Sequence, residues 1–471
     1  MRFLSSLERG LKKLHPSIKA TLSIGALAFP GLSCQSLTSP LITDGVFADL
    51  QLQACLEEVA TAQGWTMVHQ VLTLSCVDGG GPGKSFGPIT SLSGLEKLPL
   101  LTMLDVSDNQ ITDAGFSVTS NPTLLALLIS DNLVSTINNA NLTAPLLQIL
   151  VANNNALTAL DLSGVNNLQA LYVPNNALTS LTVPASVKGF PGMPTMNLPK
   201  IPGVVASNNS LSSVDLSAAT NLTALILNDN NLTAAALTGL DQLDKLEYLE
   251  LSNNSGLGAV SAIDAVNHPN LKALGLANTG LSGVYTVPII PSLSDYDLDA
   301  LGTLIKVPGL NVADNSLTGI AFAPEHANLK SLVGTSNSIL LGGVTGLSNL
   351  TSIEFIELSN NILMLGLGIT SANSTLQGLG LAATGILAIP YLSNLPNISS
   401  YNLGGQELPG LNLAGNLFSI LDLNFRNSID AMPNLKSLDM SSNIFLTLLS
   451  ILWLDSGADC LSYVVPCTIT H

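Results

Sequence analysis

One glycine-rich run has residue types that could bind a phosphate group. Residues 79–85 combine glycines with a Lys-Ser pair, as phosphate-binding loops do. However, Asp78 stands where such a loop needs glycine, and the Phe-Gly-Pro sequence at 86–88 would break the helix that should follow. We therefore expect this run to be a surface loop that binds no nucleotide.

An acidic triplet further along the chain has the spacing of a calcium loop. Asp295, Asp297 and Asp299 alternate as the first ligands of such a loop do. Ala300 occupies the position of the glycine that makes the sharp turn, and Lys306 occupies that of the closing glutamate. Two interpretations stay open, a loose calcium site or solvated loop carboxylates.

Neither the remaining polar residues nor the overall charge indicates catalysis or nucleic-acid binding. Histidines 69, 268, 326 and 471 are scattered, and no Gly-x-Ser-x-Gly or His-Glu-x-x-His motif occurs. The formal net charge is -17, whereas phosphate neutralisation needs clustered Lys and Arg. We expect no enzyme, no cofactor, no metal centre and no nucleic-acid partner, and an acidic surface that keeps the protein soluble and monomeric.

The N-terminus has the features of an export signal over residues 1–33. A basic start precedes the apolar segment 20–32, which is too short to span a bilayer. The following Gly-Leu-Ser-Cys, residues 31–34, resembles a bacterial lipobox, although the family prefers Leu where Gly31 stands. This predicts either acylation of Cys34, the chain's only contact with a membrane, or ordinary signal cleavage.

The remaining four cysteines form two pairs, one near each end of the chain. In an exported protein, local disulfides Cys55–Cys76 and Cys460–Cys467 are the natural pairing. A metal site is the alternative, but no Cys-x-x-Cys motif or neighbouring histidine favours it. Each disulfide would close one end of the structure between them.

Between these pairs, the chain repeats the pattern L-x-x-L-x-L-x-x-N-x-L about fourteen times. The L-x-L segment predicts a short strand, and the turn after it needs a buried side chain that bonds the backbone of neighbouring coils. Asn provides both donor and acceptor, and Thr is a poorer substitute. Asn fills twelve of these fourteen positions and Thr fills 279 and 384; the positions are 109, 132, 155, 176, 209, 230, 254, 279, 315, 337, 361, 384, 416 and 443.

The spacing predicts four segments: signal 1–33, lipid-anchor linker and N-terminal cap 34–98, repeats 99–445 and C-terminal cap 446–471. Three Pro-rich insertions, near 184–201, 287–307 and 389–408, enter the next coil through Ile-Pro-Gly, Val-Pro-Gly or Leu-Pro-Gly. They indicate duplication of a four-coil block. We expect them to protrude on the convex side or its edge, either as a second binding surface or as tolerated loops.

These motifs resemble the bacterial surface leucine-rich-repeat proteins, which include the internalins, over about residues 47–467. The resemblance implies an α/β-type repeat solenoid, a horseshoe of about fourteen coils with a parallel concave β-sheet and disulfide-stapled caps. It also implies protein or glycan binding at the envelope. Because no sortase motif occurs, a Gram-negative lipoprotein of the outer membrane or cell surface fits better than a wall-linked adhesin.

Function therefore depends on which surface binds. The leading interpretation is a non-catalytic envelope scaffold for a protein or glycan partner, and the alternative is an adhesive surface protein acting through weak multivalent contacts. An apolar stripe at outward strand positions is a candidate site, although β-branched residues also simply suit strands. The candidate partner-binding residues are Leu128, Val151, Tyr172, Ile226, Tyr248 and Phe355.

Overall fold

The computed structural model describes residues 41–192, 194, 200–300, 303–362, 364, 367–386, 395–404, 406–417, 432, 434–443 and 467–468. The chain divides into two compact units, Met1–Ala224 with Asp299–Thr303, and Leu225–Leu298 with Leu304–His471. The predicted signal, Cys34 and Cys460 lie outside the described residues, as does the side chain of Cys467. Lipidation and the second disulfide therefore stay predictions.

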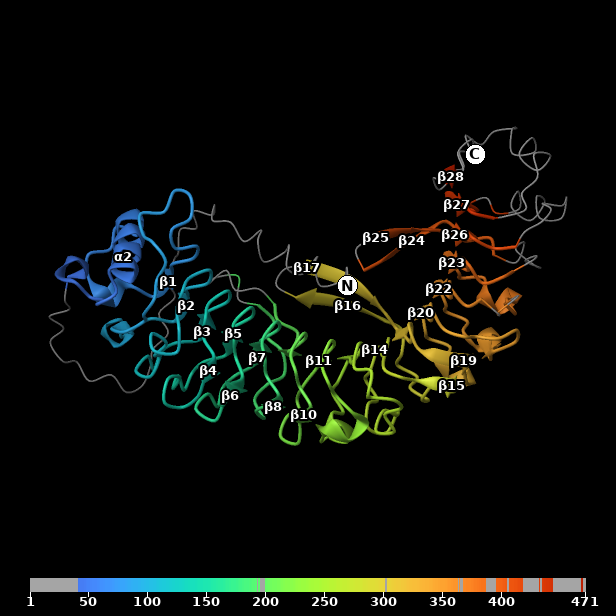
Figure 1. Ribbon diagram of the computed structural model, residues 1–471, viewed down its shortest axis with the longest axis horizontal. Helices are drawn as coiled ribbons and strands as arrows, with labels where there is room; N and C mark the ends of the chain where they lie inside the picture. Colours follow the sequence, from blue (N-terminus) through green and yellow to red (C-terminus); the bar gives the residue numbers. More distant parts are fainter. Residues whose placement is uncertain are drawn as a thin grey trace. The chain divides into compact units, whose positions relative to one another are not determined.

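Short parallel strands, one for each coil, form the concave strand face of each unit (Figure 1). The middle residue of each strand points into the core, and Leu104, Leu127 and Leu150 are fully buried there. The first unit contains, in order, β1 (Thr73–Ser75), β2 (Met103–Asp105), β3 (Ala126–Leu128), β5 (Ile149–Val151), β7 (Ala170–Tyr172) and β9 (Val204–Val205). β11 (Ala224–Ile226) lies at the division between the units.

The second unit continues the pattern with nine strands on its concave face among the described residues. Eight are parallel to their neighbours, and the last pairs antiparallel with the strand before it. In order they are β13 (Tyr248–Glu250), β14 (Ala273–Gly275), β18 (Leu310–Asn311), β20 (Ser331–Val333), β22 (Phe355–Glu357), β23 (Gly378–Gly380), β26 (Leu411–Asn412), β27 (Ser437–Asp439) and β28 (Cys467–Thr468).

The other elements are the coil walls, the hairpins and short 3-10 turns. Wall strands are β4 (Thr136–Ile137), β6 (Ala159–Leu160), β8 (Ser180–Thr182) and β10 (Ser213–Asp215) in the first unit, and β12 (Leu237–Thr238), β15 (Ser282–Thr286), β19 (Ser316–Ala321) and β21 (Val344–Thr345) in the second. Two hairpins are β16 (Asp295–Ala300) with β17 (Thr303–Pro308), and β24 (Ser400–Leu403) with β25 (Gln406–Pro409). The 3-10 turns are η1 (Ile42–Asp44), η2 (Val68–Gln70), η3 (Leu95–Lys97), η5 (Ala234–Ala236), η6 (Leu240–Gln242), η7 (Pro324–His326), η8 (Leu347–Asn349) and η9 (Ser371–Asn373).

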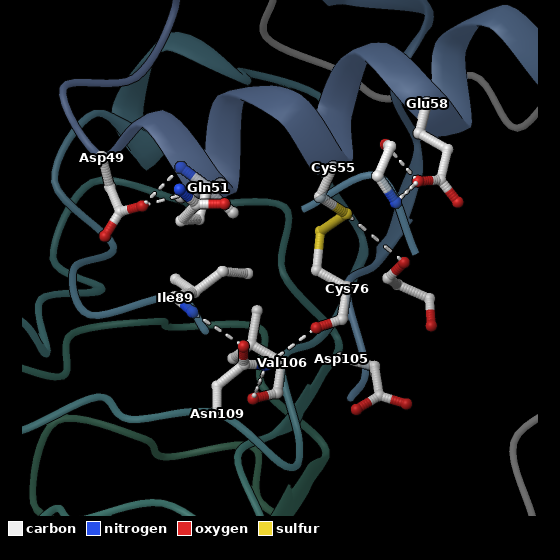
Figure 2. The surroundings of a disulfide bond; sticks show 12 residues. Asp49, Gln51, Cys55, Glu58, Cys76, Ile89, Asp105, Val106 and Asn109 are labelled. Carbon is white, nitrogen blue, oxygen red and sulfur yellow. Dashed lines mark hydrogen bonds between the residues drawn. A yellow bond between two sulfur atoms is a disulfide. The ribbon is translucent and has the colours of Figure 1, made fainter. Parts of the chain in front are cut away.

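An α-helix, α2 (Leu50–Gln63), covers the open end of the first coil (Figure 2). The Asp49 carboxylate begins the helix by accepting hydrogen bonds from the N–H groups of Gln51 and Leu52, at 2.9 and 3.1 Å. A disulfide joins Cys55 on the helix to Cys76, directly after β1, which confirms the first predicted pairing. None of the helices in the described part of the chain is long and apolar enough to cross a membrane.

The predicted asparagine ladder is confirmed. Asn109 donates from Nδ2 to the carbonyl oxygens of Cys76 and Val106, at 2.8 and 3.0 Å, and its Oδ1 accepts the N–H of Ile89 at 2.9 Å (Figure 2). One amide thus bonds the turn of its own coil and that of the coil before it. The same arrangement recurs at Asn132, Asn155, Asn176, Asn209, Asn254, Asn315, Asn337, Asn361 and Asn416.

Threonine makes only some of the hydrogen bonds that asparagine makes in the ladder, as predicted. The hydroxyl groups of Thr279 and Thr384 each donate within their own coil, to the carbonyl oxygens of Leu276 and Leu381, both at 2.8 Å. A hydroxyl group has one proton to donate, so it does not reproduce the second donation that an amide makes to the preceding coil. Both threonines precede an insertion.

A second ladder, not predicted from the sequence, lies one residue before the first. Residues there have left-handed backbone, with φ between 50° and 64°, a conformation that glycine, Asn and Asp tolerate better than other residues. In the first unit, Asn175 donates to Asn154 at 2.6 Å, and Asn154 donates to Asp131 at 2.8 Å. The signal was present as Asn-Asn and Asp-Asn pairs in many repeats.

For the second and third insertions, the expectation that they protrude on the convex side or its edge was wrong. The second and third insertions form the hairpins β16–β17 and β24–β25, and both lie over the concave strand face of the second unit (Figure 1). Each insertion ends directly before a concave strand, so its chain leaves the coil at the edge of that face. The stacking of Tyr296 and Tyr401 on concave strands then holds each hairpin on that face.

Candidate functional site

The six candidate partner-binding residues lie on concave strands β3, β5, β7, β11, β13 and β22, at the outward positions that the repeat predicts. Leu128 is half-buried, and each of the other five is at most 7% exposed. These five side chains are therefore covered, and a partner could not reach them in this state. Whether any of the six binds a partner stays a prediction.

Two stacked aromatic pairs fasten the hairpins to the strand face of the second unit. Tyr296 on β16 stacks on Tyr248 of β13, with ring centroids 5.5 Å apart. Tyr401 on β24 stacks on Phe355 of β22, with centroids 4.7 Å apart and the rings nearly parallel. Each hairpin thus reaches back over one intervening coil to an aromatic residue of the coil before it.

Small residues on the intervening coil make room for these pairs. Gly378 lies beneath the second pair, and a Cβ atom there would press against the Phe355 ring and Tyr401. Ala273 occupies the corresponding position beneath the first pair. Each stacked pair therefore depends on a residue beneath it that carries little or no side chain.

The three insertions begin in the same way, which agrees with the duplication. The N–H groups of Gly189, Ser294 and Ser399 donate to the carbonyl oxygens of Gln169, Lys272 and Gln377, each at 2.9 Å. In the first insertion, Phe190 bridges to Ile201 as Tyr401 pairs with Leu408 in the third. Phe190 and Tyr401 thus share a pairing with the residue before the Pro-Gly step, and Tyr296 and Tyr401 each lie two residues after the hydrogen-bonded serine.

Two glutamates lie beside the aromatic pairs at a second equivalent position. The Glu250 carboxylate rests over Gly275 and accepts the Tyr248 hydroxyl proton at 2.8 Å, and the Glu357 carboxylate rests over Gly380. Burial raises the pKa of Glu357, although hydrogen bonds from Ser359 oppose that shift. The ionised carboxylate is thus held in a poorly solvated position.

Two ion pairs and a backbone hydrogen bond also lie at this surface. Lys306 lies 3.1 Å from Asp295 within the first hairpin, and its carbonyl oxygen accepts the N–H of Gly404 in the second hairpin at 2.9 Å. Lys330 pairs with Glu354 on the coils below, at 3.5 Å. Burial raises the pKa of Tyr401, and the nearby carboxylates raise it further. The hairpins and the strand face below them are therefore linked by polar as well as aromatic contacts.

Comparison with known proteins identifies the fold. No family model matches the chain, and no curated protein matches it. Among solved structures, the functional domain of InlJ from Listeria monocytogenes is similar over 86% of this chain and 76% of its own, with 18% identity and a TM-score of 0.51. The internalin InlF of the same species is similar over 86% of this chain and 99% of its own, with 18% identity and a TM-score of 0.52. The leucine-rich-repeat protein LIC12759 of Leptospira interrogans is similar over 75% and 82%, with 18% identity and a TM-score of 0.52.

The fold is that of a leucine-rich-repeat solenoid.

Neither of the two ion-binding motifs in the sequence has the local geometry typical of its site. The acidic triplet lies on strand β16, where alternate carboxylates spread along one face and do not converge as calcium ligands do. In the glycine-rich run, Ser85 donates to the Glu58 carboxylate, so a negative group occupies the place a phosphate would need. Among the described residues, no group of three or more His, Cys, Asp or Glu side chains is placed to hold a metal.

Two residues that shape this surface, Tyr296 and Tyr401, were not predicted from the sequence. Both lie in insertions, outside the repeat pattern that selected the candidate residues. A signal was available, because both follow a serine by two residues and precede the Pro-Gly step of their own insertion. The accessible surface of the second unit is therefore decided by the insertions as well as by the strands.

Proposed function

We propose that this solenoid is a non-catalytic scaffold that binds a protein partner through the outer face of its two hairpins. One observation carries the proposal: the aromatic pairs hold the hairpins over the concave strands, where solenoids offer their broadest surface. The hairpins therefore present their own outward side chains in place of the strands. Four exposed residues define this hairpin face, Asp297, Leu304, Asn402 and Glu407.

The chemistry of the hairpin face favours a protein over a glycan. Sugar rings bind best on exposed aromatic faces, but the aromatic rings of these hairpins are already stacked on the strands below. The hairpin face instead offers carboxylates from Asp297 and Glu407 beside Leu304, which is 67% exposed. A partner segment with basic and aliphatic side chains is its natural complement.

We propose further that the solenoid acts outside the cytoplasm, anchored through Cys34. The Cys55–Cys76 disulfide supports export, because such bonds persist in oxidising compartments. Incorporation of labelled palmitate into the wild-type chain, and its loss in a Cys34→Ala variant, would support the anchor. Labelling that survives in that variant would rule it out and leave ordinary signal cleavage.

A binding assay on envelope membranes tests the hairpin face. We expect labelled protein to bind saturably and to be displaced by unlabelled protein. The double variant Asp297→Lys, Leu304→Glu reverses the charge and polarity of the face, and we expect it to bind at least about 30-fold more weakly.

Val266→Lys is the matched control, because Val266 is 87% exposed in the same unit but lies off the hairpins. It should bind like the wild type. Binding that fails to saturate, or that rises only with valency on a coated surface, would favour the adhesive alternative. Equal binding by the double variant and the wild type would show that the partner docks elsewhere.

A further inference from the structure

The last residues of the concave strands in the second unit form a row that the aromatic contacts of the hairpins leave aside. Those contacts lie at the first residue of a strand, Tyr248 or Phe355, whereas this row lies at the other end of each strand. Strand pairing places its members side by side, in the order Glu250, Gly275, Asn311, Val333, Glu357, Gly380, Asn412 and Asp439. The series Glu-Gly-Asn thus occurs twice, four coils apart, which agrees with the duplication.

Both copies hold the glutamate in the same orientation. Its carboxylate lies over the glycine of the next coil, in the space that a Cβ atom there would need. Its Oε1 accepts the N–H of the serine two residues later, Ser252 or Ser359, at 2.9 Å in each case. The hydroxyl groups of these serines in turn accept the N–H of Ala277 and Ala382 on the following coil, at 3.0 and 2.9 Å. One oxygen of each carboxylate is therefore fixed by the coil, and the other, Oε2, remains to be satisfied.

The two copies differ in what this second oxygen meets. In the first copy, the hydroxyl of Tyr248 donates to Oε2 of Glu250 at 2.8 Å. In the second copy, Phe355 stands at the position of Tyr248 and has no hydroxyl to donate. Within the part of the chain that the structure describes, no donor or cation bonds Oε2 of Glu357. The oxygen that the fold satisfies in one copy is open in the other.

The open carboxylate of Glu357 favours a cationic ligand. Glu357 is half-buried, and burial raises its pKa because little water stabilises the charge. An ammonium group that donates to Oε2 supplies the missing bond and neutralises the charge. Asn412, across Gly380, offers a second contact: its Oδ1 accepts the N–H of Ala414 at 3.2 Å, and its Nδ2 bonds no other described residue. A carbonyl group of the ligand can accept from this Nδ2.

We propose that Glu357 and Asn412 bind a lysine side chain of the protein partner, with Glu357 accepting from the ammonium group and Asn412 donating to a backbone carbonyl beside it. Lysine fits better than arginine, because a guanidinium group binds a carboxylate best through two parallel bonds and Ser359 already uses Oε1. This inference rests on the proposed function for its protein partner. Its residues, however, are separate from the hairpin face.

A peptide probe tests this site without the partner. Acetyl-Gly-Lys-Gly-amide should bind the full chain at physiological salt, where charges elsewhere are screened, as followed by saturation-transfer NMR. Glu357→Gln removes the charge at nearly the same shape and should raise the Kd at least about tenfold. Glu250→Gln is the matched control: it removes the same charge from the copy that Tyr248 already satisfies and should leave peptide binding unchanged.

Phe355→Tyr keeps the test decisive if Glu357→Gln fails to fold, which circular dichroism would reveal. Its hydroxyl should donate to Glu357 as that of Tyr248 does to Glu250, and the Kd should rise at least about fivefold although the carboxylate is retained. Peptide binding that either variant leaves unchanged, or that Glu250→Gln weakens equally, would overturn the proposal. Acetyl-Gly-Arg-Gly-amide should bind more weakly, and tighter binding would overturn the choice of lysine.

The peptide and the envelope membranes separate this site from the proposed function. If Glu357→Gln loses the peptide while the double variant of the hairpin face binds membranes like the wild type, the lysine site stands and the hairpin face fails. If the double variant loses the membranes while Glu357→Gln keeps the peptide, the hairpin face stands and the lysine site is overturned.

Discussion

Replacing Asn361 with alanine should lower the free energy of unfolding by about 3 kcal/mol. Asn361 is fully buried; its Nδ2 donates to the carbonyl oxygens of Gly334 and Leu358, at 3.0 and 2.7 Å, and its Oδ1 accepts the N–H of Ile339 at 3.1 Å. Alanine removes all three bonds and leaves buried backbone groups of two coils unpaired. An unpaired buried polar group costs about 1–3 kcal/mol, and this cost adds to that of the small cavity left behind.

Two matched variants separate the hydrogen bonds from the loss of volume and from the turn. Asn361→Thr should cost only about half as much, because a threonine in this position keeps the bond within its own coil, as Thr384 does. Asn360→Ala changes the neighbouring left-handed residue and should cost about 1 kcal/mol, since Ala383 adopts that conformation in another coil. Urea unfolding followed by circular dichroism measures all three. Equal losses for the alanine and threonine variants at Asn361 would contradict the ladder as the source of stability.

The repeating part of the fold could be predicted from the sequence because its causes are local and recur. Each coil buries the middle residue of its strand, as at Leu104, and places an asparagine at the turn. Because many copies repeat this pattern, the alignment of the coils is unambiguous. The Cys55–Cys76 disulfide followed from the order of the cysteines along the chain. Neither prediction required knowledge of which distant side chains meet.

The candidate site could be predicted only in part, because its accessibility depends on contacts between distant residues. Tyr248 and Phe355 were correctly placed at outward positions, but the residues that cover them lie 46 or more positions along the chain, in Tyr296 and Tyr401. The repeat pattern fixes where an insertion starts and says nothing about the side to which it folds. The acidic triplet was similarly misleading, since only its pairing in a hairpin shows that Asp295 bonds Lys306 and forms no turn.

Gly309→Ala should release the first hairpin and lower the free energy of unfolding by about 2–3 kcal/mol. Gly309 follows the Pro308 step into the next coil, and a Cβ atom there would clash with the carbonyl oxygen of Ser294 and the side chain of Leu329. The obstacle is backbone at the point where the hairpin leaves the coil, so it cannot move aside cheaply. Gly410 meets the carbonyl oxygen of Ser399 in the same way, so Gly410→Ala should release the second hairpin.

The readout must distinguish a released hairpin from general loss of stability. Freed from Tyr248, Tyr296 becomes solvent-exposed, so protease cleavage between β16 and β17 should accelerate at least about tenfold under native conditions. Gly368→Ala is the matched control, because a Cβ atom at Gly368 meets nothing within 4 Å, and it should change neither stability nor cleavage. If Gly309→Ala leaves the cleavage rate unchanged while stability falls, the glycine supports the coil and not the hairpin. The three Pro-Gly steps would then be a feature of strand entry, and the aromatic pairs alone would hold the hairpins in place.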